Sequence, residues 1–126
     1  MEKYDTSEKP PAPYVEVEVT NPQTGESVKE RGKIDTGSFK TVIPESWIDK
    51  LHLIPASEEE TRGYKEEIKK QKHYTYFVNI SIKNRVFEYA EVLAVKRDSP
   101  LIGRDILNQV KLILDGKNLS FEVLDP

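Results

Sequence analysis

The clearest pattern in the chain is a strict alternation of apolar and polar residues in two segments. In residues 14–20 (YVEVEVT) the valines occupy every second position and the glutamates lie between them. Residues 73–83 (HYTYFVNISIK) repeat the pattern, with an aromatic or aliphatic residue at every second position from Tyr74 to Ile82. Successive side chains of a strand point to opposite faces of a sheet, so both segments are predicted to be half-buried strands.

Turn-forming residues divide much of the remaining chain into short pieces typical of an all-β protein. The cluster at 21–25 (NPQTG) predicts a turn, after which residues 26–34 return as the second strand of a hairpin. Residues 45–51 are predicted to form one or two helical turns. Residues 104–110 have apolar positions at helical spacing and predict one short C-terminal helix. Further strands are predicted at 41–44, 86–95, 111–114 and 119–123.

Two segments do not fit this alternation. Residues 1–13 are polar and contain three prolines, which predicts a flexible N-terminal tail or a loosely docked arm before a single domain at 14–126. Residues 57–72 are densely charged and are compatible with either a helix or a long exposed hairpin.

Composition narrows the possible functions. The chain has 126 residues, enough for one domain, and its net charge of −3 gives neither sign a large excess. We therefore expect no nucleic acid and no membrane among its partners. Cysteine is absent, which excludes disulfides, thiolate catalysis and cysteine-ligated metals. His52 and His73 show no metal-ligand pattern, so we expect no metal and no cofactor. Without a membrane-length apolar run or a signal peptide, a cytoplasmic location is expected.

Two short motifs carry the candidate chemistry. The first follows Ile34 and precedes a predicted strand. Taken alone it is weak evidence for catalysis, because Asp and Gly are turn formers and a simple β-turn is the plainer interpretation. It consists of Asp35, Thr36, Gly37 and Ser38. The second joins two apolar residues to a glycine, directly before the predicted C-terminal helix. It consists of Leu101, Ile102, Gly103 and Arg104.

The order and spacing of these motifs resemble the retropepsins, the retroviral-type aspartic proteases, over most of the chain from Tyr14 to Val123. This resemblance implies a closed, β-barrel-like acid protease fold in which the second motif packs beneath the first. It also implies a homodimer, because aspartic proteases use two carboxylates and this chain has one such loop. Asp35 would be the catalytic residue, and a peptide or protein the substrate. Two carboxylates held close together share one proton, so that one acts as base and the other as acid.

The resemblance also assigns supporting roles around Asp35. The Thr36 hydroxyl would bond the partner loop across the two-fold axis. Gly37 would let the substrate backbone approach where a Cβ would collide. The Ser38 hydroxyl could donate to a carboxylate oxygen and favour its ionised form.

The chain departs from the retropepsin pattern in two places. The segment corresponding to the substrate-covering flap, roughly 61–73, has one glycine and many charges, so it reads equally as a solvated hairpin or helix. Phe39 and Lys40 stand where retroviral enzymes commonly have acidic residues. Arg104 would then need another partner, either Asp105 or a backbone carbonyl.

Two other functions remain open from the sequence. The same fold could be a catalytically silent dimer that binds peptides or acts as an assembly module, with Asp35 kept for loop structure; the charged flap segment favours this reading. A small β-barrel binding module unrelated to proteases would leave the two spaced motifs unexplained.

Overall fold

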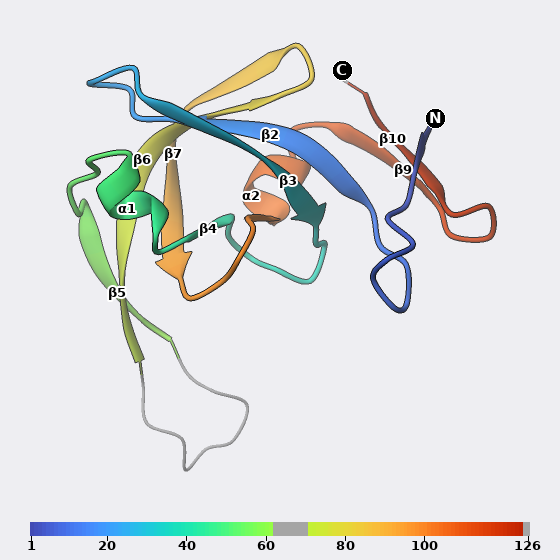
Figure 1. Ribbon diagram of the computed structural model, residues 1–126, viewed down its shortest axis with the longest axis horizontal. Helices are drawn as coiled ribbons and strands as arrows, with labels where there is room; N and C mark the ends of the chain where they lie inside the picture. Colours follow the sequence, from blue (N-terminus) through green and yellow to red (C-terminus); the bar gives the residue numbers. More distant parts are fainter. Residues whose placement is uncertain (62–70, 125–126) are drawn as a thin grey trace.

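Strands make up most of the regular secondary structure in the described part of the chain (Figure 1). The computed structural model describes residues 1–61 and 71–124, with side chains described outside 57–73. The two helices found there are single turns, α1 (Trp47–Lys50) and α2 (Arg104–Leu107), and neither is long enough to cross a membrane. The strands are β1 (Glu2–Lys3), β2 (Tyr14–Thr20), β3 (Ser27–Ile34), β4 (Val42–Pro44), β5 (Ser57–Thr61), β6 (Gln71–Ile82), β7 (Arg85–Val95), β8 (Leu101–Ile102), β9 (Lys111–Asp115) and β10 (Ser120–Leu124).

Seven strands form one sheet that turns back on itself. Their order is β2–β3–β8–β4–β7–β6–β5, and β2 also pairs with β6, from Val17↔Ile82 to Thr20↔Asn79. This extra pairing wraps the sheet around the core, so the predicted all-β, barrel-like fold is confirmed. A smaller sheet, β1–β10–β9, lies at the side of the molecule where both termini are found (Figure 1).

The apolar residues of the two alternating segments form much of the core. Every second residue of β2 from Val15 and of β6 from Tyr76 points inward, and each buried valine or isoleucine contributes about 1.5–3 kcal/mol of transfer free energy. The buried residues are Val15, Val17 and Val19 on β2, and Tyr76, Val78, Ile80 and Ile82 on β6. Tyr74, the first residue of the β6 series, is instead 48% exposed, because it lies where β6 leaves the core for the β5–β6 hairpin.

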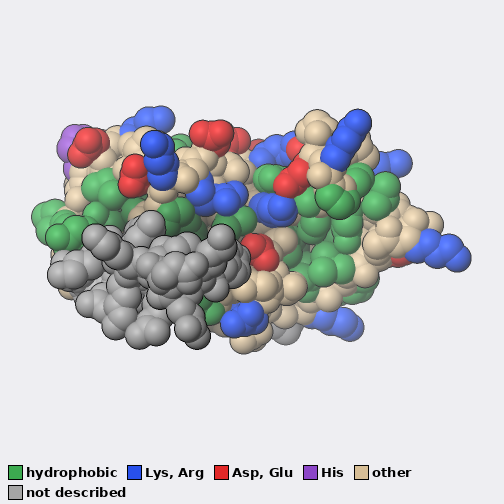
Figure 2. Space-filling view, turned by 90° about the horizontal axis from the view of Figure 1, so that it is seen from below, with side chains coloured by type: hydrophobic (Ala, Val, Ile, Leu, Met, Phe, Trp, Pro, Cys, Tyr) green, Lys and Arg blue, Asp and Glu red, His purple; other side chains and the backbone are tan. Residues whose placement is uncertain are grey.

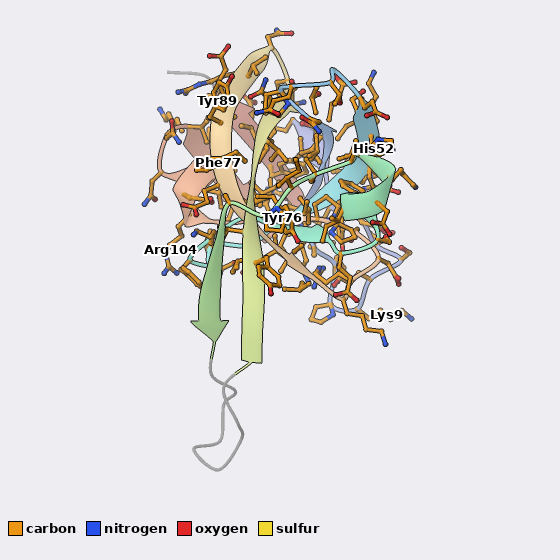
Figure 3. The ribbon with its side chains drawn as sticks, turned by 90° about the vertical axis from the view of Figure 1, so that its left-hand side faces the viewer. Lys9, His52, Tyr76, Phe77, Tyr89 and Arg104 are labelled. Carbon is orange, nitrogen blue, oxygen red and sulfur yellow. The ribbon has the colours of Figure 1, made fainter. Side chains whose placement is uncertain are left out.

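The β6–β7 hairpin departs from a regular ladder at one point. Val78 pairs with Ala90 but Ile80 pairs with Phe87, so β7 contains an extra residue there. Tyr89 takes up this bulge with a φ of 52°, and its N–H donates to Asn79 Oδ1 at 2.9 Å. The bulge turns the Tyr89 ring outward, on the side of the hairpin where Phe77 also lies (Figure 3).

The first residues of the chain lie against the rest of the protein. β1 pairs with β10 through Glu2↔Phe121 and Lys3↔Ser120, and the Tyr4 ring packs on Phe121 with 6.1 Å between centroids. Residues 1–13 are thus in contact with the domain in this structure, as a docked arm would be. Their flexibility and the domain boundary at residue 14 stay predictions.

The charged segment at 57–72 contributes strands at both of its ends. β5 pairs with β6 in antiparallel register from Ser57↔Thr75 to Thr61↔Gln71, which is the hairpin alternative rather than the helix. The predicted flap segment, 61–73, therefore begins and ends in paired strands. Its central part, 62–70, lies outside the described residues.

Candidate functional site

The fold brings the two sequence motifs side by side. β3 ends at Ile34, directly before Asp35, and pairs in parallel with β8 through Lys33↔Leu101 and Ile34↔Ile102. Ile34 and Ile102 are both buried. Two apolar residues thus anchor the loop that begins at Asp35 to the segment that precedes α2.

Asp35 is fixed mainly through its backbone. Its N–H donates to the carbonyl of Ile102 at 3.0 Å, and its own carbonyl accepts from the N–H of Ser38 at 3.1 Å. The carboxylate closes the turn, because Oδ1 accepts from the N–H of Gly37 at 2.9 Å. Asp35 is half-buried, whereas Thr36 and Gly37 are exposed. The loop is therefore held from behind and open on its outer side.

Gly103 lies where the two motifs make their closest contact. A Cβ at this position would lie 2.6 Å from the carbonyl carbon of Lys40, 2.7 Å from its oxygen and 2.9 Å from the carbonyl oxygen of Ser38. The φ of Gly103 is −96°, which any residue can adopt, so space alone requires glycine. Its absent side chain lets the N–H of Arg104 donate to the Ser38 carbonyl at 2.8 Å.

A polar network missed by the sequence analysis ties the end of the loop to α2. The buried Thr41 hydroxyl donates to Asp105 Oδ1 at 2.7 Å and accepts from the N–H of Gly103 at 3.0 Å. The same carboxylate oxygen accepts from the N–H groups of Thr41 and Ile106. The sequence signals were a threonine before an apolar strand and an aspartate in a first helical turn. Each is common, and nothing in their spacing predicts that they meet.

Arg104 and Ser38 both bond to backbone carbonyls of the loop. Nη1 of Arg104 donates to the Thr36 carbonyl at 3.0 Å, so a backbone carbonyl replaces the acidic partner that the sequence lacks. The Ser38 hydroxyl donates to the Lys40 carbonyl at 2.7 Å, rather than to the Asp35 carboxylate as expected. Both contacts brace the shape of the loop. The Arg104 side chain itself lies at the surface (Figure 3).

The exposed side of the loop also carries an apolar residue. The Phe39 side chain is 57% exposed and lies four residues after Asp35 in the chain. The face seen from below in Figure 2 mixes basic, acidic and hydrophobic side chains without segregating one sign of charge. One chain therefore presents a single carboxylate on a braced loop, beside apolar surface. A lone carboxylate can act as acid or base, and a second one would complete a pair.

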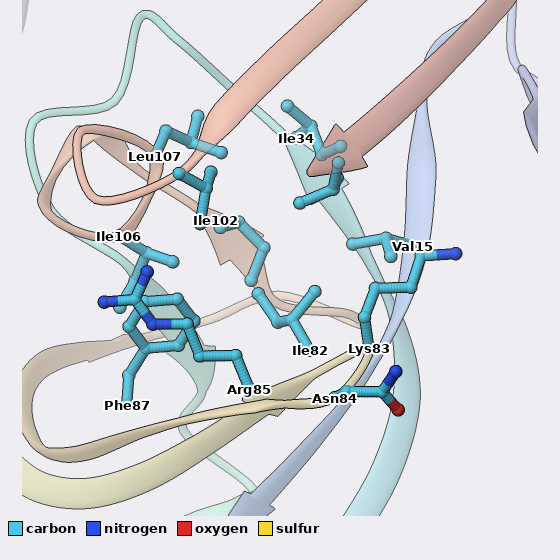
Figure 4. A pocket seen from close by; sticks show the side chains of 12 residues that line it. Val15, Ile34, Ile82, Lys83, Asn84, Arg85, Phe87, Ile102, Ile106 and Leu107 are labelled. Atoms are coloured by element: carbon cyan, nitrogen blue, oxygen red, sulfur yellow. The ribbon is translucent and has the colours of Figure 1, made fainter. Parts of the chain in front are cut away.

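The apolar hollow behind the loop is a different feature. It is lined mainly by aliphatic side chains, among them Ile34, Ile82 and Ile102, with Lys83 and Arg85 at one side (Figure 4). Its free volume is about 30 Å³, enough for a water molecule or two and far too small for a peptide. Among the described residues, no group of three or more histidine, aspartate or glutamate side chains is placed to hold a metal ion.

Comparison with solved structures identifies the fold, whereas comparison of sequences does not. No protein-family model and no curated protein matches the sequence. Among solved structures, a retropepsin-like aspartic protease from Rickettsia conorii is 19% identical over 93% of this chain and 86% of that chain, with a TM-score of 0.64. The EIAV protease complexed with the inhibitor HBY-793 is 18% identical over 77% and 86% of the two chains, with a TM-score of 0.53.

A foamy viral protease–reverse transcriptase in complex with double-stranded DNA is 24% identical over 79% of this chain, with a TM-score of 0.52. Only 16% of that viral chain is covered, so this chain corresponds to a small part of it. These likenesses show that the chain has a retropepsin-like fold.

Proposed function

We propose that this protein is an aspartic endopeptidase whose active site is formed by two copies of the chain, each contributing Asp35. The observation that carries the proposal is the loop itself. Asp35 stands at the open side of a turn that the segment 101–105 braces from behind, through Ile102, Gly103, Arg104 and Asp105. Thr36 and Gly37 beside Asp35 are exposed, which leaves the outer side of the loop open to a substrate and to a second chain.

The chemistry follows from placing two such carboxylates together. Like charges this close cannot both ionise, so the pair would hold one proton over a wide pH range and titrate as a unit. The ionised member would take a proton from a bound water, while the protonated member would give one to the peptide carbonyl oxygen. Hydrolysis would proceed through a tetrahedral intermediate, with activity highest in the acidic range.

The neighbouring residues would complete the paired loops. The exposed Thr36 hydroxyl is available to bond the partner's loop across the two-fold axis. Exposed Gly37 leaves room for a substrate backbone beside Asp35. Ser38 would act through its bond to the Lys40 carbonyl, as a brace for the loop. Phe39 adds apolar surface next to this space, which supports a peptide with apolar side chains as substrate.

The homodimer would bury the open side of the loop together with the terminal strands. The segment 119–123 includes most of β10, and Leu119 is 38% exposed in the single chain. Leu114, opposite Phe121 on β9, is 44% exposed. A two-fold contact uses the same patch on both copies, so each of these leucines would be buried in both chains of the dimer.

The test is peptide cleavage by wild type and Asp35→Asn, with Asp98→Asn as a control for loss of one carboxylate elsewhere. A diverse peptide library is incubated with each protein at several acidic pH values. Proton transfer typically contributes about 10²–10⁴ in rate, and the asparagine variant loses both carboxylates of the pair at once, so its cleavage should fall below detection. The Asp98→Asn protein should cleave as wild type does.

Binding separates the enzyme from the silent module. A peptide mimic whose hydroxyl sits between the two carboxylates should bind wild type and lose most of its affinity for Asp35→Asn. Equal cleavage by wild type and Asp35→Asn would refute the assignment. If neither protein cleaved any peptide and both bound the same peptides equally, the catalytically silent dimer would replace the enzyme as the best account.

A further inference from the structure

The N-terminal arm, residues 5–13, is held to β3 by two ion pairs. Asp5 Oδ2 lies 3.2 Å from Nη1 of Arg31, and Glu8 Oε1 lies 2.6 Å from Nζ of Lys33. Arg31 and Lys33 are two residues apart on one strand, so both cations project from the same face of β3. Lys9 marks the arm in Figure 3, on the side of the molecule away from Tyr89.

The backbone of the arm leads directly to the catalytic loop. Asp5 and Ala12 exchange two N–H···O bonds, at 2.7 and 3.2 Å, which fold the arm on itself, and Ala12 is buried. One residue later, the Pro13 carbonyl accepts from the N–H of Ile34 at 3.0 Å. Ile34 immediately precedes Asp35. The end of β3 is therefore held by β8 on one side and by the arm on the other.

We propose that the arm is a carboxylate-operated brace: ionised Asp5 and Glu8 fasten it to Arg31 and Lys33 and steady the strand that carries Asp35, and their protonation loosens it. Its effect on Asp35 rests on the proposed function. The docking itself does not.

The surroundings of the two carboxylates favour their ionised forms. The pKa of Asp5 is lowered first by the hydroxyl and N–H of Ser7, which both donate to Oδ1, and then by Arg31. The pKa of Glu8 is lowered first by its bond to Lys33 and then by the nearby Tyr14 hydroxyl, while the charge of Asp5 opposes this.

Tyr14 is a further titratable group beside Glu8, and its own pKa depends on the neighbouring charges. Burial raises the pKa of Tyr14 and Glu8 raises it further, whereas the charge of Arg97 lowers it. Tyr14 therefore stays neutral while the carboxylates titrate, and Arg97 adds one more cation to this face.

The direction of the pH effect follows from these shifts. A carboxylate whose pKa is lower when docked stabilises the docked state at pH values above its ordinary pKa. That stabilisation is lost as the pH falls through the lowered pKa. The ordinary values are 3.8 for Asp5 and 4.5 for Glu8, so the arm should be held tightly near neutral pH and more loosely below about pH 4.

The contacts are weak enough to reverse. The side chains of the Arg31–Asp5 pair are 53% and 21% exposed, and those of the Lys33–Glu8 pair 31% and 32%, so water screens both. Among the described residues, Glu8 Oε2 is buried without a hydrogen-bond partner. This lost hydration opposes docking.

The test compares wild type with the double variant Asp5→Asn/Glu8→Gln by NMR-detected amide exchange. At pH 7, protection of the amides of residues 5, 12 and 34 should fall about two- to thirtyfold in the variant, the range expected for two exposed ion pairs. Core amides such as that of Val92 should not change. The matched control Glu45→Gln/Glu88→Gln removes two exposed carboxylates elsewhere and should leave all these amides as in wild type.

The pH series supplies the second readout. After correction for intrinsic exchange, wild-type protection of these amides should fall below about pH 4, and that of the double variant should be flat. Unchanged protection at pH 7 in the double variant, or the same pH response in both proteins, would overturn the brace. If the wild type cleaves peptides, the variant should lose activity at pH 5–6 relative to the control. Loss of arm protection with full activity would overturn the link to Asp35 while leaving the docking intact.

Discussion

Replacing Gly103 by alanine tests how tightly the two motifs are pressed together. The new Cβ would lie 2.6 Å from the Lys40 carbonyl carbon and 2.9 Å from the Ser38 oxygen, and both are backbone atoms that no rotamer change can move away. The loop or β8 must shift. Overpacking of this kind costs about 1–3 kcal/mol.

A shift also weakens the hydrogen bonds made beside Gly103. Its N–H donates to the Thr41 hydroxyl, and the next N–H donates to the Ser38 carbonyl. Two such bonds contribute about 1 kcal/mol each. Alanine restricts the unfolded chain and returns about 0.4–1 kcal/mol. The net expected loss in the free energy of unfolding is therefore about 2–4 kcal/mol.

Urea denaturation followed by Trp47 fluorescence measures this loss, because Trp47 is buried and is the chain's one tryptophan. The control is Gly116→Ala in the β9–β10 turn, where an added Cβ would meet no atom within 4 Å. That change should alter the free energy of unfolding by less than about 1 kcal/mol. If Gly103→Ala were no more destabilising than Gly116→Ala, the close contact inferred between the motifs would be wrong.

Three further outcomes are expected. Thr41→Val should lower the free energy of unfolding by about 1–3 kcal/mol, because it leaves the Gly103 N–H without its acceptor and removes one of the three donors to Asp105 Oδ1. Thr41→Ser, which keeps the hydroxyl, should cost less, and equal losses in the same urea assay would contradict the network. Arg104→Gln should slow peptide cleavage while the protein stays folded, since it frees the Thr36 carbonyl. Cleavage at the wild-type rate would remove Arg104 from the site. Leu119→Asn should weaken the dimer at least tenfold in analytical ultracentrifugation, because the lost apolar contact occurs twice; an unchanged dimer would place the interface elsewhere.

The strands could be predicted because their pattern is local. Alternation along β2 and β6 follows directly from the geometry of a strand, and the core residues follow from the alternation. The predicted strands at 73–83 and 86–95 leave Asn84 and Arg85 for the turn between them, which is one residue too late: Ile82 pairs with Arg85, so Lys83 and Asn84 form the turn. The expected signal, a glycine, is missing, and Lys83 adopts a φ of 58° instead.

The braces of the loop could not be predicted, because they join residues far apart in the sequence. Thr41 and Asp105 are individually ordinary, and their hydrogen bond exists only once β4 lies beside β8. The arm shows the same limitation. Its polar, proline-rich composition indicates a tail. Its attachment depends on the ion pair between Glu8 and Lys33, which are distant in the sequence and meet only in the folded chain.

The position of β8 in the chain also determines when the loop can become ordered. Proteins are synthesised from the N-terminus, and contacts between distant segments form late because the chain must first close a long loop. The residues around Asp35 leave the ribosome before Ile102, Gly103 and Asp105, which hold that loop and emerge only after the long intervening segment. A nascent or truncated chain therefore carries the aspartate without the geometry that would make it useful. If the protein is a protease, incomplete chains cannot cleave proteins during synthesis, because the segment that orders the loop is made after the loop.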